Sequence, residues 1–67
     1  MPPKIRQLIR KLETAGFVLN RQRGSHRHFR HESGMRVTIS GKDGDDARHY
    51  QLRLVGKAII EVSDEEK

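Results

Sequence analysis

Arginine and histidine residues gather in one short part of this sequence, and both side chains suit phosphate chemistry. The stretch 21–36 contains five arginines and three histidines. A guanidinium group makes paired hydrogen bonds to phosphate oxygens. Histidine has an ordinary pKa near neutrality, so it can accept or release a proton under physiological conditions. This stretch therefore predicts a phosphate-binding surface that can also transfer protons. The residues are Arg21, Arg23, His26, Arg27, His28, Arg30, His31 and Arg36.

Cleavage of RNA by its own 2′-hydroxyl group needs such a surface. A base removes the 2′ proton, a cation stabilises the charge on the phosphorane, and an acid protonates the leaving 5′ oxygen. The route needs no metal ion, and DNA is inert to it because DNA lacks the 2′-hydroxyl. A hydrolytic triad is not favoured, since no Asp stands where it could complete one with Ser25 and His26.

Three other interpretations of the same residues stay open. A histidine in a basic strand is more often a polar surface residue, and the whole basic stretch can be a solvated hairpin. Because His26 and His28 are two residues apart on a strand, they project the same way and could bind a metal. No third ligand is evident, and the arginines nearby repel cations. A base-stacking platform is disfavoured, because the few aromatic residues are better explained as core.

The elements that position these residues follow from the spacing of apolar side chains. Residues 5–15 are apolar at every third or fourth position, which predicts a helix that stops at Gly16. A loop at 41–44 precedes a second helix, and we expect Asp45 or Asp46 to cap that helix. The apolar arc of the second helix is wider than one sheet face needs. It comprises Tyr50, Leu52, Leu54, Val55, Ala58, Ile59, Ile60 and Val62.

Between the helices, residues 17–23, 26–31 and 35–40 are typical of strands separated by turns. The order helix, three strands, helix predicts an α+β two-layer α-β-β-β-α sandwich, with three antiparallel strands and both helices on one face. Alternation then assigns side chains to faces. Phe29 is the one apolar residue of 26–31, so it should point inward, together with Arg27 and His31. The side chains expected on the open face are His26, His28, Arg30, Arg36 and Thr38.

Length and composition limit the class of protein. Sixty-seven residues make one domain, 1–67, which we expect to end in a frayed acidic tail at about 63–67. There is no cysteine, so a disulfide framework and a thiolate zinc site are excluded. The longest apolar runs are far too short to span a membrane. We therefore expect a cytoplasmic protein with no membrane association.

Charge is distributed unevenly along the chain. Residues 1–42 carry ten basic and two acidic side chains, a net of +8, whereas residues 43–67 carry four and seven, a net of −3. The sum is the overall +5. The strong positive charge of residues 1–42 indicates a polyanionic partner.

Three motifs within residues 5–39 match a known family. They are Gly16-Phe17 after an amphipathic helix, Arg21-x-Arg23-Gly24-Ser25-His26-x-x-Phe29, and Gly34-x-x-Val37-Thr38-Ile39. With these motifs the chain resembles the HicA family of type II toxins, which are small mRNA interferases with a double-stranded-RNA-binding-domain-like fold. The resemblance covers about half of the chain. After the third strand the family often has Val-Pro-x-His, where this chain has Ile39-Ser40-Gly41-Lys42.

The resemblance implies a reaction, a site and a partner. The family's catalytic histidine maps onto His26, and the glycine of its turn maps onto Gly24. Members of the family are held inactive by a HicB-type antitoxin encoded beside them.

We therefore expect a toxin that cleaves mRNA as an endoribonuclease, without a metal or other cofactor, and that a HicB-type antitoxin neutralises. His26 acts as general base or acid, and His28 is the candidate for a second proton-transfer group. A non-catalytic RNA-binding module of the same fold is the alternative. A DNA-associated accessory protein is a third interpretation, but no basic recognition helix supports it. The residues expected to bind RNA are Arg21, Arg23, Gly24, Ser25, Arg30 and Arg36, while Arg27 is the least suited because of its inward parity.

Overall fold

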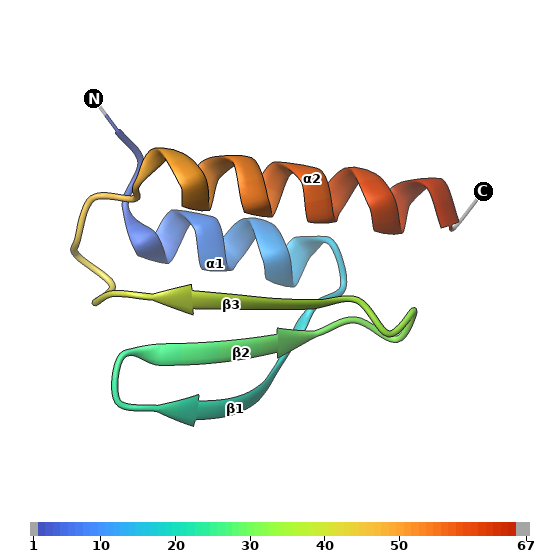
Figure 1. The fold of residues 1–67 in the computed structure, drawn as a ribbon, viewed down its shortest axis with the longest axis horizontal. Helices are drawn as coiled ribbons and strands as arrows, with labels where there is room; N and C mark the ends of the chain where they lie inside the picture. The colour runs from blue at the N-terminus through green and yellow to red at the C-terminus, as the bar shows by residue number, and fades with distance from the viewer. Residues whose placement is uncertain (1, 66–67) are drawn as a thin grey trace.

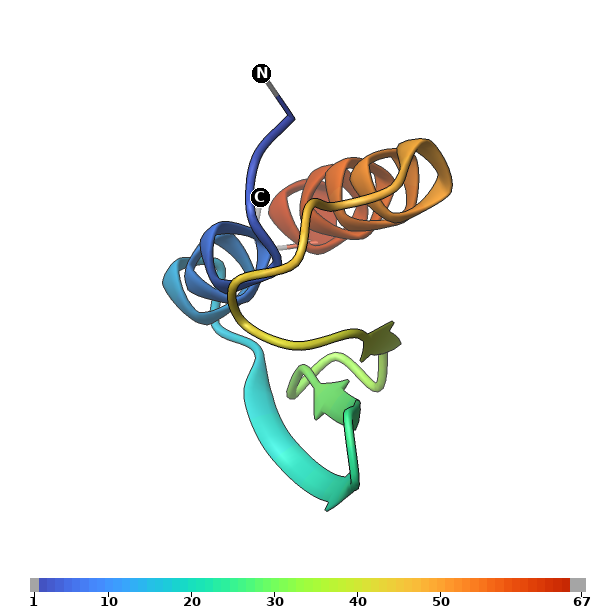
Figure 2. The same cartoon turned by 90° about the vertical axis from the view of Figure 1, so that its left-hand side faces the viewer.

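Two helices cover one face of a three-stranded sheet in the computed structural model, which describes the backbone of residues 2–65 and the side chains of residues 2–63 (Figure 1). The sheet order is β1-β2-β3, and both strand pairs are antiparallel. Seen end-on, α1 and α2 lie side by side above the sheet (Figure 2). The predicted α+β two-layer sandwich is confirmed. The elements are α1 (Ile5–Thr14), β1 (Val18–Arg23), β2 (His26–Arg30), β3 (Arg36–Ser40) and α2 (His49–Glu65).

Helix α1 ends where its sequence predicts. Gly16 has a φ of 99°, a left-handed conformation that residues with a Cβ rarely adopt. The Gly16 N–H donates to the carbonyl of Glu13 at 3.0 Å, and the Phe17 N–H donates to the carbonyl of Leu12 at 2.9 Å. This pair of bonds is a Schellman motif, which satisfies the last carbonyls of the helix and turns the chain into β1.

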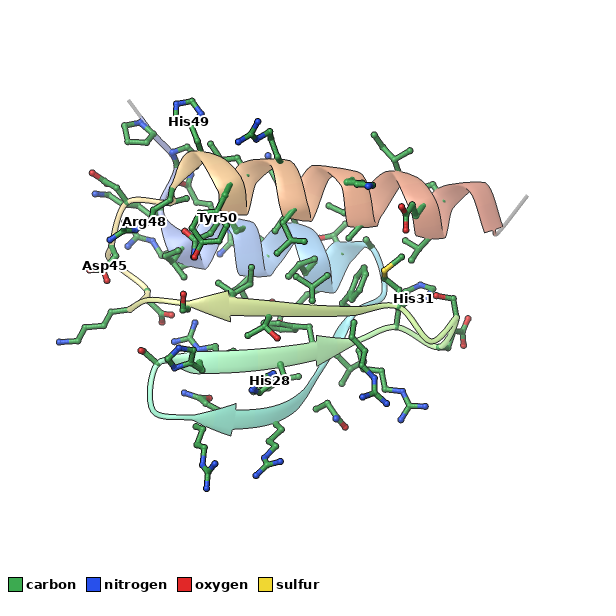
Figure 3. All side chains as sticks on the ribbon, in the orientation of Figure 1. His28, His31, Asp45, Arg48, His49 and Tyr50 are labelled. Atoms are coloured by element: carbon green, nitrogen blue, oxygen red, sulfur yellow. The ribbon has the colours of Figure 1, made fainter. Side chains whose placement is uncertain are left out.

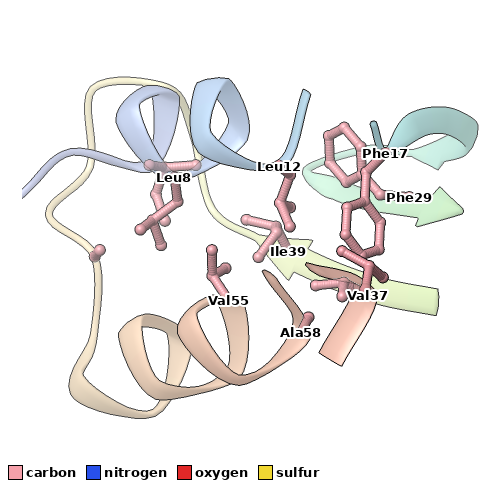
Figure 4. Close-up of a cluster of buried hydrophobic side chains, with 11 residues drawn as sticks. Leu8, Leu12, Phe17, Phe29, Val37, Ile39, Val55 and Ala58 are labelled. Carbon is pink, nitrogen blue, oxygen red and sulfur yellow. The ribbon is translucent and has the colours of Figure 1, made fainter. Parts of the chain in front are cut away.

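The hydrophobic core lies between the helices and the sheet (Figure 4). Phe29 is buried, as alternation along β2 predicts, and Phe17 packs beside it. His31 is also buried, and its ring lies 5.2 Å from that of Phe17, centroid to centroid. The buried apolar residues are Ile5, Leu8, Leu12, Phe17, Phe29, Val37, Ile39, Ala47, Val55, Ala58 and Val62.

The prediction that Asp45 or Asp46 caps the second helix is wrong. Helix α2 begins at His49, and the residue before it is Arg48. The Asp46 carboxylate instead pairs with Lys4 Nζ at 2.5 Å, at the start of α1. Aspartate is a favoured capping residue. Asp45 and Asp46 nevertheless lie three or four residues before His49, which is too far from the first turn of α2 to cap it.

The loop between β3 and α2 caps α1 rather than α2. The Ile5 N–H donates to the carbonyl of Asp45 at 2.9 Å, and the Arg6 N–H donates to the carbonyl of Asp43 at 3.1 Å. The first N–H groups of a helix have no partner within the helix, so an outside acceptor must satisfy them. The loop is therefore fixed against the first turn of α1.

Helix α2 exposes part of its apolar surface. Tyr50 and Ile60 are 53% and 62% exposed, and Leu54 is 39% exposed. The predicted excess of apolar surface on this helix is confirmed. The segment expected to form a frayed tail begins inside α2, which continues to Glu65, and residues 66 and 67 lie outside the described part of the chain. No helix within residues 2–65 has the length and apolar content needed to cross a membrane.

Candidate active site

The cross-strand register arranges the candidate residues in rows on the open face of the sheet. Residues directly opposite each other in antiparallel strands point to the same side. His26 is opposite Arg23 on β1 and Ser40 on β3. It therefore stands between a guanidinium group and a hydroxyl group, on the face away from both helices. His26 is exposed to solvent.

A second row repeats this composition two residues further along β2. His28 is opposite Arg21 on β1 and Thr38 on β3. Its side chain projects from β2 (Figure 3). Its Nδ1 atom shares a hydrogen bond of 2.9 Å with Thr38 Oγ1. His28 is half-buried, so its ring is held more firmly than an exposed one. Because Nδ1 is engaged, Nε2 is the ring atom left to meet a substrate.

A β-bulge brings the arginines of β1 into these rows. Leu19 pairs with Phe29, and the next pair is Arg21 with His28, so Asn20 has no partner on β2. Along a regular strand, Leu19 and Arg21 would lie on the same side. The extra residue breaks the alternation, leaving Leu19 on the side of the helices and Arg21 on the open face.

The row around His28 lies in a shallow, cationic hollow of about 210 Å³. Three guanidinium groups line it, and Arg30 and Arg36 form a third cross-strand pair beyond the His28 row. Such a hollow suits a phosphate group with the imidazole beside it. Its lining residues are Asn20, Arg21, His28, Phe29, Arg30, Arg36 and Thr38.

The turn before His26 is tightly held. Gly24 has a φ of 59°, in the left-handed region that favours glycine. The Gln22 side-chain amide donates to the Gly24 carbonyl at 3.1 Å, and the Gly41 N–H donates to the Ser25 carbonyl at 3.2 Å. The predicted turn at Gly24 and Ser25 is thus present, and it starts the strand that carries both histidines.

Two residues of the basic stretch lie away from the open face, as alternation predicts. The Arg27 guanidinium forms an ion pair with the Asp43 carboxylate, with 2.6 Å between Nη2 and Oδ1. The buried His31 accepts a hydrogen bond at Nδ1 from the Ser33 N–H at 3.0 Å. Both residues therefore act within the fold rather than on the open face.

A metal centre would need a third ligand beside His26 and His28. Among the side chains that the structure describes, no three His, Cys, Asp or Glu residues come together in a way that could hold a metal ion.

The sequence model of one family matches most of the chain. That family is described as the HicA toxin of bacterial toxin–antitoxin systems, and the match spans residues 5–59. The chain belongs to the HicA toxin family. No curated protein matches it. The match runs from α1 into α2, so it includes the first part of the second helix, which the motifs of residues 5–39 do not reach. A HicA toxin belongs to a toxin–antitoxin pair, and an antitoxin partner is therefore implied.

Two structural features near the site are not predicted by the sequence. The bulge at Asn20 leaves no signal in residue type. The loop at 41–43 lies beside the turn at 24–25, as the bond between Gly41 and Ser25 shows. No periodicity connects segments so far apart in the chain, and only the pairing of β2 with β3 brings them together.

Proposed function

We propose that this HicA-family protein is an endoribonuclease toxin that cleaves mRNA, with His26 as a proton-transfer group. The observation that carries the proposal is the pair of rows on the open sheet face. Each row sets an imidazole between an arginine of β1 and a hydroxyl group of β3. Family membership supports the toxin role, and the rows supply groups that suit phosphate chemistry.

The reaction uses the RNA's own 2′-hydroxyl as nucleophile. One imidazole accepts the 2′ proton while O2′ forms a bond to the adjacent phosphorus. The bond from phosphorus to O5′ breaks, and a second group donates a proton to O5′. The products are a 2′,3′-cyclic phosphate and a free 5′-hydroxyl, so neither water nor a cofactor enters the step.

His26 and His28 divide these tasks between them. His26 is exposed and follows the held turn, so it can approach the RNA backbone from the edge of the sheet. His28 is the second proton-transfer group, and its bond to Thr38 fixes the orientation of its ring. The guanidinium groups hold the backbone and stabilise the charge that develops on the phosphorane. The RNA-binding residues in this proposal are Arg21, Arg23, Gly24, Ser25, Arg30 and Arg36.

A HicB-type antitoxin neutralises this activity by covering the basic face. Guanidinium groups buried without carboxylates would cost too much, so the partner is acidic where it meets Arg21, Arg23 and Arg30. The same contacts would compete directly with RNA phosphates.

Replacement of His26 tests the catalytic proposal. His26→Ala should cut RNA about 10²–10⁴-fold more slowly than the parent, because one general acid or base is typically worth that much. His49→Ala is the matched control, since His49 is exposed on α2 and away from the sheet. The parent's products should carry 2′,3′-cyclic phosphate ends. If the parent binds RNA but never cleaves it, the protein is an RNA-binding module and the enzyme proposal is wrong.

A further inference from the structure

The loop at 41–43 is attached to the hairpin that carries His26 by bonds on both sides of Lys42. On one side, the Gly41 N–H donates to the carbonyl of Ser25 at 3.2 Å. On the other, the Asp43 carboxylate pairs with Arg27 at 2.6 Å. Both chain neighbours of Lys42 are therefore fixed to the hairpin, and the Lys42 backbone is held beside the turn.

The side chain of Lys42 is left available by the same contacts. Asp43, the nearest acid in the chain, is engaged by Arg27, whose side chain is only 17% exposed. Asp45 accepts the Lys42 backbone N–H at 3.0 Å. Lys42 itself is exposed, and its ammonium group forms no ion pair with any of the side chains described. The exposed ammonium group of Lys42 thus stands next to the turn.

A shallow hollow of about 340 Å³ connects this lysine to the turn before His26. The hollow adjoins the His26 row, because Ser40 is opposite His26 and is followed directly by Gly41. Arg27 and Asp43 in its lining are paired with each other, which leaves Lys42 as the one charged lining residue without an ion pair. It is lined by Gly24, Ser25, Arg27, Gly41, Lys42 and Asp43.

We infer that Lys42 is a further substrate-binding residue, whose ammonium group contacts an RNA phosphate beside the His26 turn. An ammonium group binds phosphate as a compact point charge, with no demand for a planar fork. Its place beside the turn adds a cation next to the His26 row. The inference rests on the proposed function. In it, the ion pair with Arg27 keeps the Asp43 carboxylate from pairing with the Lys42 ammonium group.

The test measures binding and not cleavage, in the His26→Ala protein with a 2′-O-methyl oligonucleotide. The slope of log K against log salt is negative, and removing one phosphate contact to a single strand makes it shallower by about 0.7. Lys42→Met should show that reduction, and Lys42→Arg should not. Lys57→Met is the matched control, because Lys57 is an exposed lysine on α2 and its loss changes the net charge equally. Lys42 is exposed, so each variant should melt like its parent.

The outcomes separate this inference from the proposed function. If Lys42→Met and Lys57→Met, each made in the His26→Ala protein, have the slope of His26→Ala alone, Lys42 does not bind phosphate and the inference is overturned, while cleavage by the unsubstituted protein still supports the enzyme. If the unsubstituted protein binds the oligonucleotide without cleaving RNA, the enzyme proposal is overturned, and a shallower slope for Lys42→Met still supports this contact. If neither the unsubstituted protein nor His26→Ala binds the oligonucleotide, both are overturned.

Discussion

Arg21 lies directly opposite His28 across β1 and β2, and the unpaired residue Asn20 makes this pairing possible. Leu19 faces the helices, two residues before an arginine that faces solvent. The bulge lets one short strand place an apolar residue on the covered side and, two residues later, a cation on the open side. The cationic rows are therefore a product of the backbone as much as of composition.

A relocated charge tests whether the open face binds RNA. The double variant Arg21→Gln, Gln22→Arg keeps the net charge but moves the guanidinium to a residue that pairs with Arg27, on the side of the helices. Its slope of log K against log salt should become shallower by about 0.7, as for Arg21→Gln alone, because each protein loses one phosphate contact. Titration of a non-cleavable oligonucleotide at several salt concentrations measures the slopes.

The control for relocation is Arg53→Gln, which removes an exposed arginine from α2. Its slope should equal that of the parent. A double variant that binds with the parent's slope would show that RNA responds to total charge and not to this face.

The parts of the site that the sequence predicts are those that local patterns govern. One apolar residue, Phe29, assigns the faces of β2, and the structure agrees. The end of α1 follows from Gly16, whose conformational freedom is a local property. In contrast, the faces of β1 depend on a bulge that its residue types do not reveal.

The misassigned cap has a comparable cause. Asp45 and Asp46 are good capping residues by type, but their position is fixed by contacts with the first turn of α1. The Asp45 carbonyl accepts the Ile5 N–H, and the Asp46 carboxylate pairs with Lys4. A long-range backbone contact took precedence over a local preference. The same loop brings Lys42 to the site, which is why neither feature could be found from spacing.

The bond between His28 and Thr38 predicts an effect of Thr38→Val on cleavage. The variant removes the hydroxyl while keeping a β-branched side chain, which suits an exposed strand position. A hydrogen bond is worth about 0.5–1.5 kcal/mol net, so kcat should drop by a few-fold to about tenfold. KM should change little, because the hydroxyl orients the imidazole and holds no phosphate.

Thr38→Ser keeps the hydroxyl and should retain the parent's kcat. The pH–rate profile gives a second readout, since a loosened second proton-transfer group changes its shape. An unaltered kcat and profile in Thr38→Val would exclude His28 from the proton transfers.

Gly16 should be sensitive to replacement. An alanine there would adopt a φ of 99°, and its Cβ would lie 3.2 Å from His31 Nε2. The left-handed conformation alone costs roughly 1–2 kcal/mol. Since 1 kcal/mol corresponds to about 4–8 °C in a domain of this size, thermal unfolding should show Gly16→Ala melting at least about 4 °C lower.

Gly56→Ala provides a control of opposite sign. Gly56 lies within α2, and a Cβ there meets no atom within 4 Å. Alanine should stabilise the helix by up to about 1 kcal/mol. Equal melting temperatures for Gly16→Ala and the parent would contradict the strain assigned to the junction.

The last prediction concerns the antitoxin, and it follows from two exposed surfaces, one on α2 and one on the open face of the sheet. Tyr50 and Leu54 are one turn apart on α2 and are exposed, while the histidine rows are on the sheet. A HicB-type antitoxin that stabilises the toxin should cover apolar surface and so raise its melting temperature by mass action. Leu54→Asp should therefore weaken the complex about tenfold or more, yet leave RNA cleavage by the free toxin unchanged.

Charge reversal separates the two contributions to the complex. Arg23→Glu should weaken it as well, because it sets like charges against an acidic partner surface. The two masking routes, occlusion of His26 and blockage of the basic face alone, differ in what the His26 ring experiences. NMR titration of the imidazole in the complex distinguishes them. A titration identical to that of the free toxin, in a complex that no longer cleaves RNA, rules out occlusion of His26. If instead Leu54→Asp and Arg23→Glu bind the antitoxin as tightly as the parent, neither surface belongs to the interface.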